Sequence, residues 1–168
     1  MYDPDGMSAD AEQLPSLREA TPTAPRRIRV MVLDDDDCVR HVVTQMLRRR
    51  NCDVIAFSDA RSCCAHANSA CDCPCQNDGI CADVLITDIK MPGLDGLDYL
   101  DVLTRHGCQI PFRAVMSAFW TAESLDRARH HGCRIFVKPV GVFEIDRWLE
   151  TIECVIDYDR PVVDHYRS

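Results

Sequence analysis

Five short apolar runs, each followed by a polar or charged residue, most constrain what this sequence can fold into. The runs are IRVMVL, DVIAF, VLIT, RAVM and IFV. Between them apolar residues recur at helical spacing, which predicts helices at about residues 39–47, from 59, 94–103, 122–131 and 143–152. Short strands that alternate with helices predict an α/β fold, a doubly wound five-stranded parallel sheet with helices on both faces.

Polar side chains end four of these predicted strands. Asp34 and Asp35 follow the first, Asp88 the third, Ser117 the fourth and Lys138 the fifth. Parallel sheets place their sites beyond the carboxyl ends of the strands, so we expect these side chains to converge. Three carboxylates suit Mg²⁺, while a hydroxyl and an ammonium group suit the oxygens of a phosphoryl group. One aspartate remains free to attack phosphorus.

The fragments VLDDDD, LITDIKMPGLDG, VMSA and FVKP, in this order, resemble the receiver domain of bacterial two-component response regulators. The resemblance covers about residues 27–156 and implies a flavodoxin-like strand order, 2-1-3-4-5. It further implies that Asp88 accepts a phosphoryl group from a sensor histidine kinase or a histidine phosphotransfer protein. Asp34, Asp35, Asp88 and the backbone carbonyl of Lys90 would then hold Mg²⁺.

The same resemblance assigns roles to two other strand-end residues. Ser117 would be the hydroxyl residue of the switch, and Lys138, joined to Pro139 by a cis peptide, would contact the phosphoryl group. One position departs from the family pattern: Ile135 stands where the family usually has an aromatic switch residue. Phe136 follows it, and alternation along a strand predicts that Phe136 points to the opposite face.

A second departure is a cysteine-rich insertion at about residues 63–81, where such domains usually have a short loop. Its candidate ligands are Cys63, Cys64, His66, Cys71, Cys73, Cys75 and Cys81. Thiolates and imidazoles bind Zn²⁺ or an iron–sulfur cluster, but the spacing matches no standard motif, so disulfides or uncoordinated thiols remain open alternatives. The scattered cysteines are expected to be small buried apolar residues, namely Cys38, Cys52, Cys108, Cys133 and Cys154.

Other polar and aromatic residues receive structural interpretations. Asp36 and Asp37 are expected to cap the first helix, because acids favour a helix N-terminus. Four histidines are expected on helix surfaces, namely His41, His106, His130 and His131. Trp120 and Trp148 are expected to be packing residues, and Trp120 follows Ser117 closely enough to report motion of that loop.

Charge and hydropathy indicate which partners and which cellular location to expect. The 168 residues carry a formal net charge of −8, which repels phosphate backbones and argues against a nucleic-acid partner. The sequence has neither a signal peptide nor a run of about 20 apolar residues, so we expect a cytoplasmic protein without membrane insertion. We expect a flexible arm over residues 1–26, one domain over 27–156 and a C-terminal tail over 157–168.

These features favour a single-domain response regulator, a phosphoacceptor signalling protein that assists its own phosphorylation and dephosphorylation but is not an enzyme. Phosphorylation would switch its binding to an unknown downstream protein. One alternative makes the cysteine-rich insertion a metal- or redox-sensing interaction module. Another is a phosphatase of the haloacid-dehalogenase type, whose nucleophile would lie on the first strand, where Asp35 and Asp37 crudely fit its motif.

Overall fold

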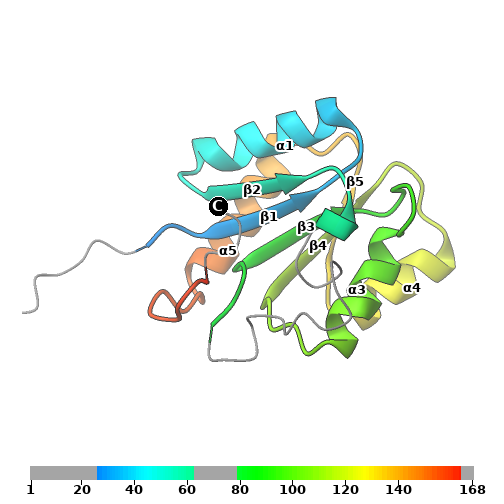
Figure 1. Cartoon of the computed structure of the whole chain (residues 1–168). Coiled ribbons are helices and arrows are strands. Elements are labelled where there is room, and N and C mark those ends of the chain that lie inside the picture. Colours follow the sequence, from blue (N-terminus) through cyan, green and yellow to red (C-terminus); the bar gives the residue numbers. More distant parts are fainter. Residues whose placement is uncertain (1–25, 63–78, 164–168) are drawn as a thin grey trace, which may run out of the picture.

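The computed structural model describes residues 26–62 and 79–163, which build one parallel sheet (Figure 1). Its strands are β1 (Arg29–Leu33), β2 (Asp53–Phe57), β3 (Val84–Asp88), β4 (Phe112–Ser117) and β5 (Arg134–Val137). They pair in the order β2-β1-β3-β4-β5, with every pairing parallel. The predicted flavodoxin-like α/β fold is therefore confirmed.

Four α-helices and one short 3₁₀ turn are present in the described part of the chain. They are α1 (Asp37–Arg49), η1 (Ala60–Ser62), α3 (Gly96–Arg105), α4 (Ala122–His130) and α5 (Val142–Glu153). The α-helices lie where the apolar spacing predicts them. The helix expected from Asp59 is represented only by η1, and the residues that follow η1 lie outside the described ranges.

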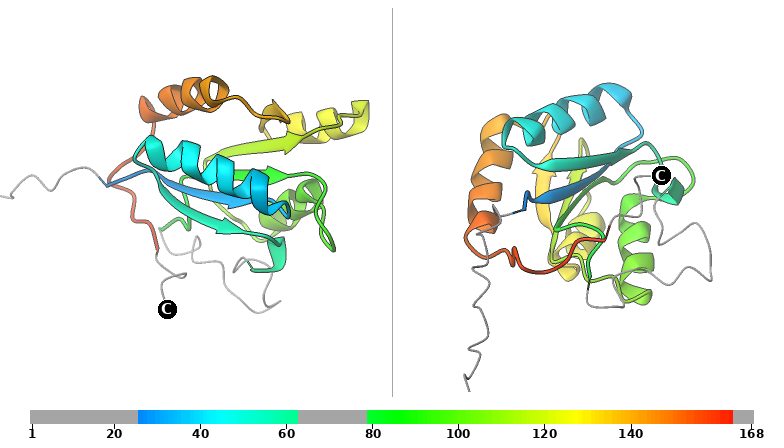
Figure 2. Two further views of the ribbon diagram at one scale, coloured as in Figure 1. Left: turned by 90° about the horizontal axis from the view of Figure 1, so that it is seen from above. Right: turned by 60° about the vertical axis from the view of Figure 1, so that its left-hand side comes forward.

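The helices form one layer on each face of the sheet (Figure 2). Alternate residues of β1 explain this arrangement, because Val30 and Val32 pack with α1 and α5, whereas Met31 and Leu33 pack with α3 and α4. Every residue of β1 and of β3 is buried. Strands covered on both faces need continuous apolar runs, which is why these two segments do not alternate with polar residues.

The strand β5 carries the departure from the family pattern at Ile135. Phe136 is buried in the α1 and α5 layer, where its ring meets Trp148 edge-on at 5.6 Å between centroids. Ile135 packs on the other face, with the α3 and α4 layer. The prediction that the two side chains point to opposite faces is confirmed.

Helix caps hold the loops at the carboxyl end of the sheet. The Asp36 carboxylate accepts hydrogen bonds from the backbone N–H groups of Cys38 and Val39, at 2.8 and 3.1 Å, as the sequence predicts. Asp37 lies in the first turn of α1 and pairs with Arg40. The chain therefore turns away from the sheet immediately after Asp35.

The described cysteines divide into two groups. Cys52 and Cys108 are buried, and burial raises the pKa of Cys52 and of the half-buried Cys133 to about 11, which keeps both thiols protonated at neutral pH. Cys38 and Cys154 are exposed instead, so the prediction of burial is wrong for these two. Cys38 lies in the first turn of α1, and Cys154 is the C-cap residue of α5.

The C-terminal segment packs back on the domain. Ile80 and Val162 form an isolated parallel bridge, with Ile80 N–H donating to Pro161 O at 3.0 Å and Val163 N–H to Ile80 O at 2.9 Å. Arg26 pairs with the buried Asp83 at 2.6 Å and also donates to the carbonyls of Asp157 and Arg160. We name residues 157–163 the C-terminal strap. It runs past the amino-terminal edge of the sheet, opposite the strand ends that carry the candidate site (Figure 1).

No helix within residues 26–62 and 79–163 is long and apolar enough to cross a bilayer. The proposed arm lies outside the described residues except for Arg26, which the Asp83 ion pair holds against the strap.

Candidate functional site

Three aspartates converge at the carboxyl edge of the sheet. Asp34 follows β1, where its N–H continues the pairing with β2 by donating to Phe57 O at 3.2 Å, and Asp88 is the last residue of β3. One carboxylate oxygen from each of Asp34, Asp35 and Asp88 lies within 4.8 Å of the other two. Asp34 and Asp88 are buried, whereas Asp35 is exposed.

Lys138 contacts both buried carboxylates. Its Nζ lies 2.7 Å from Asp34 Oδ2 and 2.8 Å from Asp88 Oδ1. Its backbone N–H donates to Ser117 O at 2.9 Å, which fixes the residue at the end of β5, and the Lys138–Pro139 bond is cis as expected. The aspartates and this lysine therefore form one compact charged cluster.

The charges in this cluster shift each other's protonation. Burial raises the pKa of Asp88, and the negative charges of Asp34 and Asp35 add to that, while the hydrogen bond from Lys138 opposes them. Burial alone would lower the pKa of Lys138, but its hydrogen bonds to Asp34 and Asp88 outweigh burial and raise it. Lys138 is therefore a permanent cation at neutral pH, and the pocket favours a further positive charge near the aspartates.

Ser117 lies at the end of β4 beside Asp88, but its hydroxyl is engaged elsewhere. Ser117 Oγ donates to Phe119 O at 2.8 Å and accepts from Phe119 N–H at 3.2 Å. Trp120 follows in the same loop, where its indole N–H donates to Phe136 O at 3.3 Å. To donate to any group on Asp88, the Ser117 hydroxyl must release the Phe119 carbonyl.

Gly96 explains how α3 is seated so close to the phosphoacceptor candidate. Its N–H donates to Ile89 O at 2.9 Å, and a Cβ atom at this position would lie 1.9 Å from the backbone oxygen of Asp88. The same Cβ atom would lie 2.8 Å from Thr87 Oγ1. No side chain larger than hydrogen fits, so the glycine permits α3 to begin against the backbone of Asp88.

The donor set fits a hard divalent cation. Oxygen ligands from few carboxylates are the kind that Mg²⁺ accepts, and two of the three are buried and fixed by the ends of neighbouring strands. Among the described residues, these three aspartates are the one group of three or more histidine, cysteine or acidic side chains whose ligand atoms converge. Lys90, whose carbonyl the resemblance adds to the set, is exposed two residues after Asp88.

The sequence matches the family model described as the response regulator receiver domain over residues 30–149. The chain belongs to this family. The match contains every residue of the charged cluster, and the fold around it is the receiver fold.

The curated relatives are longer than this chain. The receiver domain described here is 30% identical over 132 residues to the DNA-binding transcriptional regulator NtrC of Proteus hauseri, covering 78% of this chain and 25% of that protein. It is 27% identical over 144 residues to the alkaline phosphatase synthesis transcriptional regulatory protein SphR of Synechococcus elongatus, covering 80% of this chain and 52% of that protein. The chain thus spans between a quarter and about half of these curated relatives.

Solved structures agree with the receiver fold. The chemotaxis protein CheY4 of Vibrio cholerae superposes with a TM-score of 0.58 at 21% identity, over 78% of this chain and all of that one. The N-terminal domain of an uncharacterized protein from Wolinella succinogenes gives a TM-score of 0.61 at 26% identity, over 76% of this chain and 95% of that one.

Within the described residues, Asp37 and Cys81 lie outside the charged cluster. Asp37, the second acid of the phosphatase alternative, is exposed and paired with Arg40 at the start of α1. Cys81 is buried in the hydrophobic core on the α3 and α4 face. The remaining candidate ligands of the insertion, Cys63, Cys64, His66, Cys71, Cys73 and Cys75, lie outside the described residues.

Sequence reasoning missed a second polar cluster, between α3 and α4. The prediction that His131 is a surface residue is wrong, because its side chain is only 7% exposed and its Nε2 lies 2.8 Å from Asp101 Oδ1. Arg127 also reaches Asp101 from α4. The only signal in the sequence is charge complementarity between the two segments, which local spacing does not reveal.

Proposed function

We propose that Asp88 accepts a phosphoryl group from a phosphohistidine of a sensor histidine kinase or histidine phosphotransfer protein. The observation that carries this proposal is the contact of Asp88 with Lys138, beside Asp34 and Asp35, in a chain of the receiver family. Phosphorylation would switch binding of a protein partner by the receiver domain itself. The net charge of −8 argues against nucleic acid as that partner.

The proposed transfer needs one nucleophile and two stabilising groups. A carboxylate oxygen of Asp88 forms the new P–O bond, while the donor P–N bond breaks and its electron pair leaves with the imidazole nitrogen, which takes up a proton. The Lys138 ammonium lies beside Asp88 Oδ1, where it offsets charge on the phosphoryl oxygens. The same ammonium holds the attacking carboxylate in place before transfer.

Mg²⁺, when bound, would supply positive charge for the phosphoryl oxygens. Asp34, Asp35, Asp88 and the Lys90 carbonyl are the groups proposed to hold it. Because Asp34 and Asp88 are buried and share a single lysine, they leave negative charge that a divalent cation would balance.

The proposed switch passes through Ser117. A phosphoryl group on Asp88 offers new acceptor oxygens, and the Ser117 hydroxyl donates to one of them only after it leaves the Phe119 carbonyl. That exchange of acceptors moves the loop over residues 117–121 and alters the surface near α4. With Ile135 at the usual aromatic position, no aromatic side chain moves at that place in β5.

The direct test is intact-mass spectrometry of the purified protein after incubation with acetyl phosphate. We expect one phosphoryl adduct that forms with Mg²⁺, fails to form with excess EDTA and maps to the peptide that contains Asp88. Absence of any adduct in the presence of Mg²⁺ would refute the proposal, and so would an adduct on a different residue.

Lys138→Met tests the charge that the lysine supplies. We expect the rate of adduct formation to fall about 100-fold or more, because the variant loses the cation that faces the phosphoryl oxygens. The matched control is Arg134→Met, which removes an exposed cation from β5, the strand that Lys138 follows. Time courses of the adduct by mass spectrometry measure both rates, and equal rates for wild type and Lys138→Met would remove Lys138 from the mechanism.

A further inference from the structure

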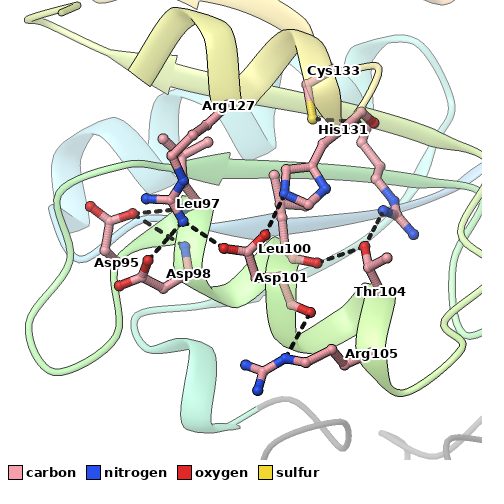
Figure 3. A network of polar contacts seen from close by, with 11 residues as sticks. Asp95, Leu97, Asp98, Leu100, Asp101, Thr104, Arg105, Arg127, His131 and Cys133 are labelled. Carbon is pink, nitrogen blue, oxygen red and sulfur yellow. Dashed lines mark hydrogen bonds and ion pairs between the residues drawn. The ribbon is translucent and has the colours of Figure 1, made fainter. Parts of the chain in front are cut away.

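A polar network joins α4 to α3 (Figure 3). Arg127 NH2 lies 2.8 Å from Asp98 Oδ1 and 2.7 Å from Asp101 Oδ2. Asp101 Oδ1 lies 2.8 Å from Nε2 of His131, the C-cap residue that follows α4. Two acids of α3 thus hold an arginine and a histidine from α4.

This network differs from an ordinary surface ion pair. Arg127 is two-thirds buried and contacts two carboxylates at once, and the imidazole of His131 is almost fully covered, although the side chains of Asp98 and Asp101 are about half exposed. Burial would raise the pKa of Asp101, but hydrogen bonds from Arg127 and His131 outweigh that effect and lower it, so its carboxylate stays charged. By contrast, Arg129 pairs with Asp126 inside α4 at 3.2 Å, with both side chains largely exposed. Such solvated pairs within one helix contribute little.

Apolar packing holds α4 less well than the other helices. Ala128 is its one fully buried residue, whereas α3 buries five residues and α1 and α5 bury three each. Burial of apolar side chains is the main force that keeps a surface helix on its sheet. The polar network therefore adds to an attachment of α4 that rests on little buried apolar surface.

The position of α4 is connected to the candidate site through one short loop. Ser117 ends β4, and α4 begins at Ala122 behind the cap residue Thr121. Phe119, between them, is largely exposed and lines a hollow together with Lys90 and Arg127. When the Ser117 hydroxyl leaves Phe119, the loop loses both of its hydrogen bonds to that hydroxyl, and the far end of this loop is fixed to α4.

We propose that Asp98, Asp101, Arg127 and His131 form a latch that holds α4 against α3 and opposes the loop movement required by Ser117. The regulatory role of the latch rests on the proposed function, because it concerns phosphorylation of Asp88. The four side chains do not touch the reacting atoms, so they are positioning residues. Opening the latch lowers the cost of the phosphorylated arrangement and makes phosphorylation faster.

The test compares Arg127→Met with Arg129→Met in the full chain, since both remove one arginine from α4. Amide hydrogen exchange is measured without phosphodonor, and adduct formation is then followed with acetyl phosphate and Mg²⁺. In Arg127→Met we expect exchange over residues 118–125 to rise roughly threefold to tenfold and phosphorylation to accelerate by a similar factor. Exchange in β1 and β3 should stay as in wild type, and Arg129→Met should match wild type in both measurements.

Each alternative outcome overturns a defined part of the proposal. Unchanged exchange over residues 118–125 in Arg127→Met would overturn the latch, and so would a uniform rise that includes β1 and β3. Raised local exchange with an unaltered phosphorylation rate would overturn its control of the switch. If even wild type took no phosphoryl group, the proposed function and the regulatory role would fall together, and the exchange data would still separate that failure from a failure of the latch.

Discussion

An Asp88→Asn variant is expected to form no phosphoryl adduct with acetyl phosphate and Mg²⁺. The carboxamide has nearly the same shape as the carboxylate but lacks the nucleophilic charge, and it removes one of three converging acidic ligands. The expected effect is complete loss of the adduct in intact-mass spectra. Because Asp88 is the last residue of β3 and its carboxylate carries a raised pKa, its replacement by a neutral group should leave the fold intact.

The control for this variant is Asp126→Asn, which changes an exposed aspartate of α4 and should phosphorylate as wild type does. Asp35→Asn distinguishes the receiver mechanism, with Asp88 as nucleophile, from the phosphatase mechanism, with Asp35 as nucleophile. In a receiver it weakens the proposed Mg²⁺ site and raises the Mg²⁺ concentration needed for adduct formation. Steady release of phosphate that survives Asp88→Asn and disappears in Asp35→Asn would instead support a phosphatase with its nucleophile on β1.

Gly96→Ala is expected to lower the free energy of unfolding by roughly 3 kcal/mol or more. The new methyl group would lie 1.9 Å from the backbone oxygen of Asp88, and neither the strand nor the first turn of α3 yields easily. Whatever relief occurs displaces Asp88 itself, so we expect adduct formation to fall in any fraction that folds. Urea unfolding followed by circular dichroism measures the loss of stability.

Gly141→Ala is the matched control, because Gly141 also stands at a helix start and also has a negative φ. There the added Cβ would approach only the flexible side chain of Glu144, at 3.3 Å. We expect a loss below about 1 kcal/mol, the size of a changed N-cap preference. Equal losses in the two variants would show that close contact with Asp88 is not what excludes a side chain at position 96.

The parts of the structure that follow from local pattern were predictable from sequence. Apolar runs fix the strands because both faces of a parallel sheet are covered, and the polar residues after those runs meet because parallel strands share one carboxyl edge. Asp34, Asp88 and Lys138 are therefore brought together by topology alone. Phe136 and Ile135 likewise separate to opposite faces because side chains alternate along β5.

The parts that depend on distant pairs were not predictable. Arg127 meets Asp98 across 29 residues of sequence, and no periodicity marks that partnership. The covered position of His131 follows from the same contact with α3. Cys38 and Cys154 were expected to be buried because cysteine usually is, but both are exposed, one in the first turn of α1 and the other at the C-cap of α5. The type of a residue sets its average tendency to be buried, whereas its place in the fold decides its actual exposure.

The C-terminal strap determines where a neighbouring domain could attach. Arg26 and Val163 are both held at the amino-terminal edge of the sheet, one by Asp83 and the other by Ile80. The carboxyl edge with Asp88 is the opposite end of the strands. A domain fused directly behind Val163 would thus begin at the end of the strands opposite Asp88.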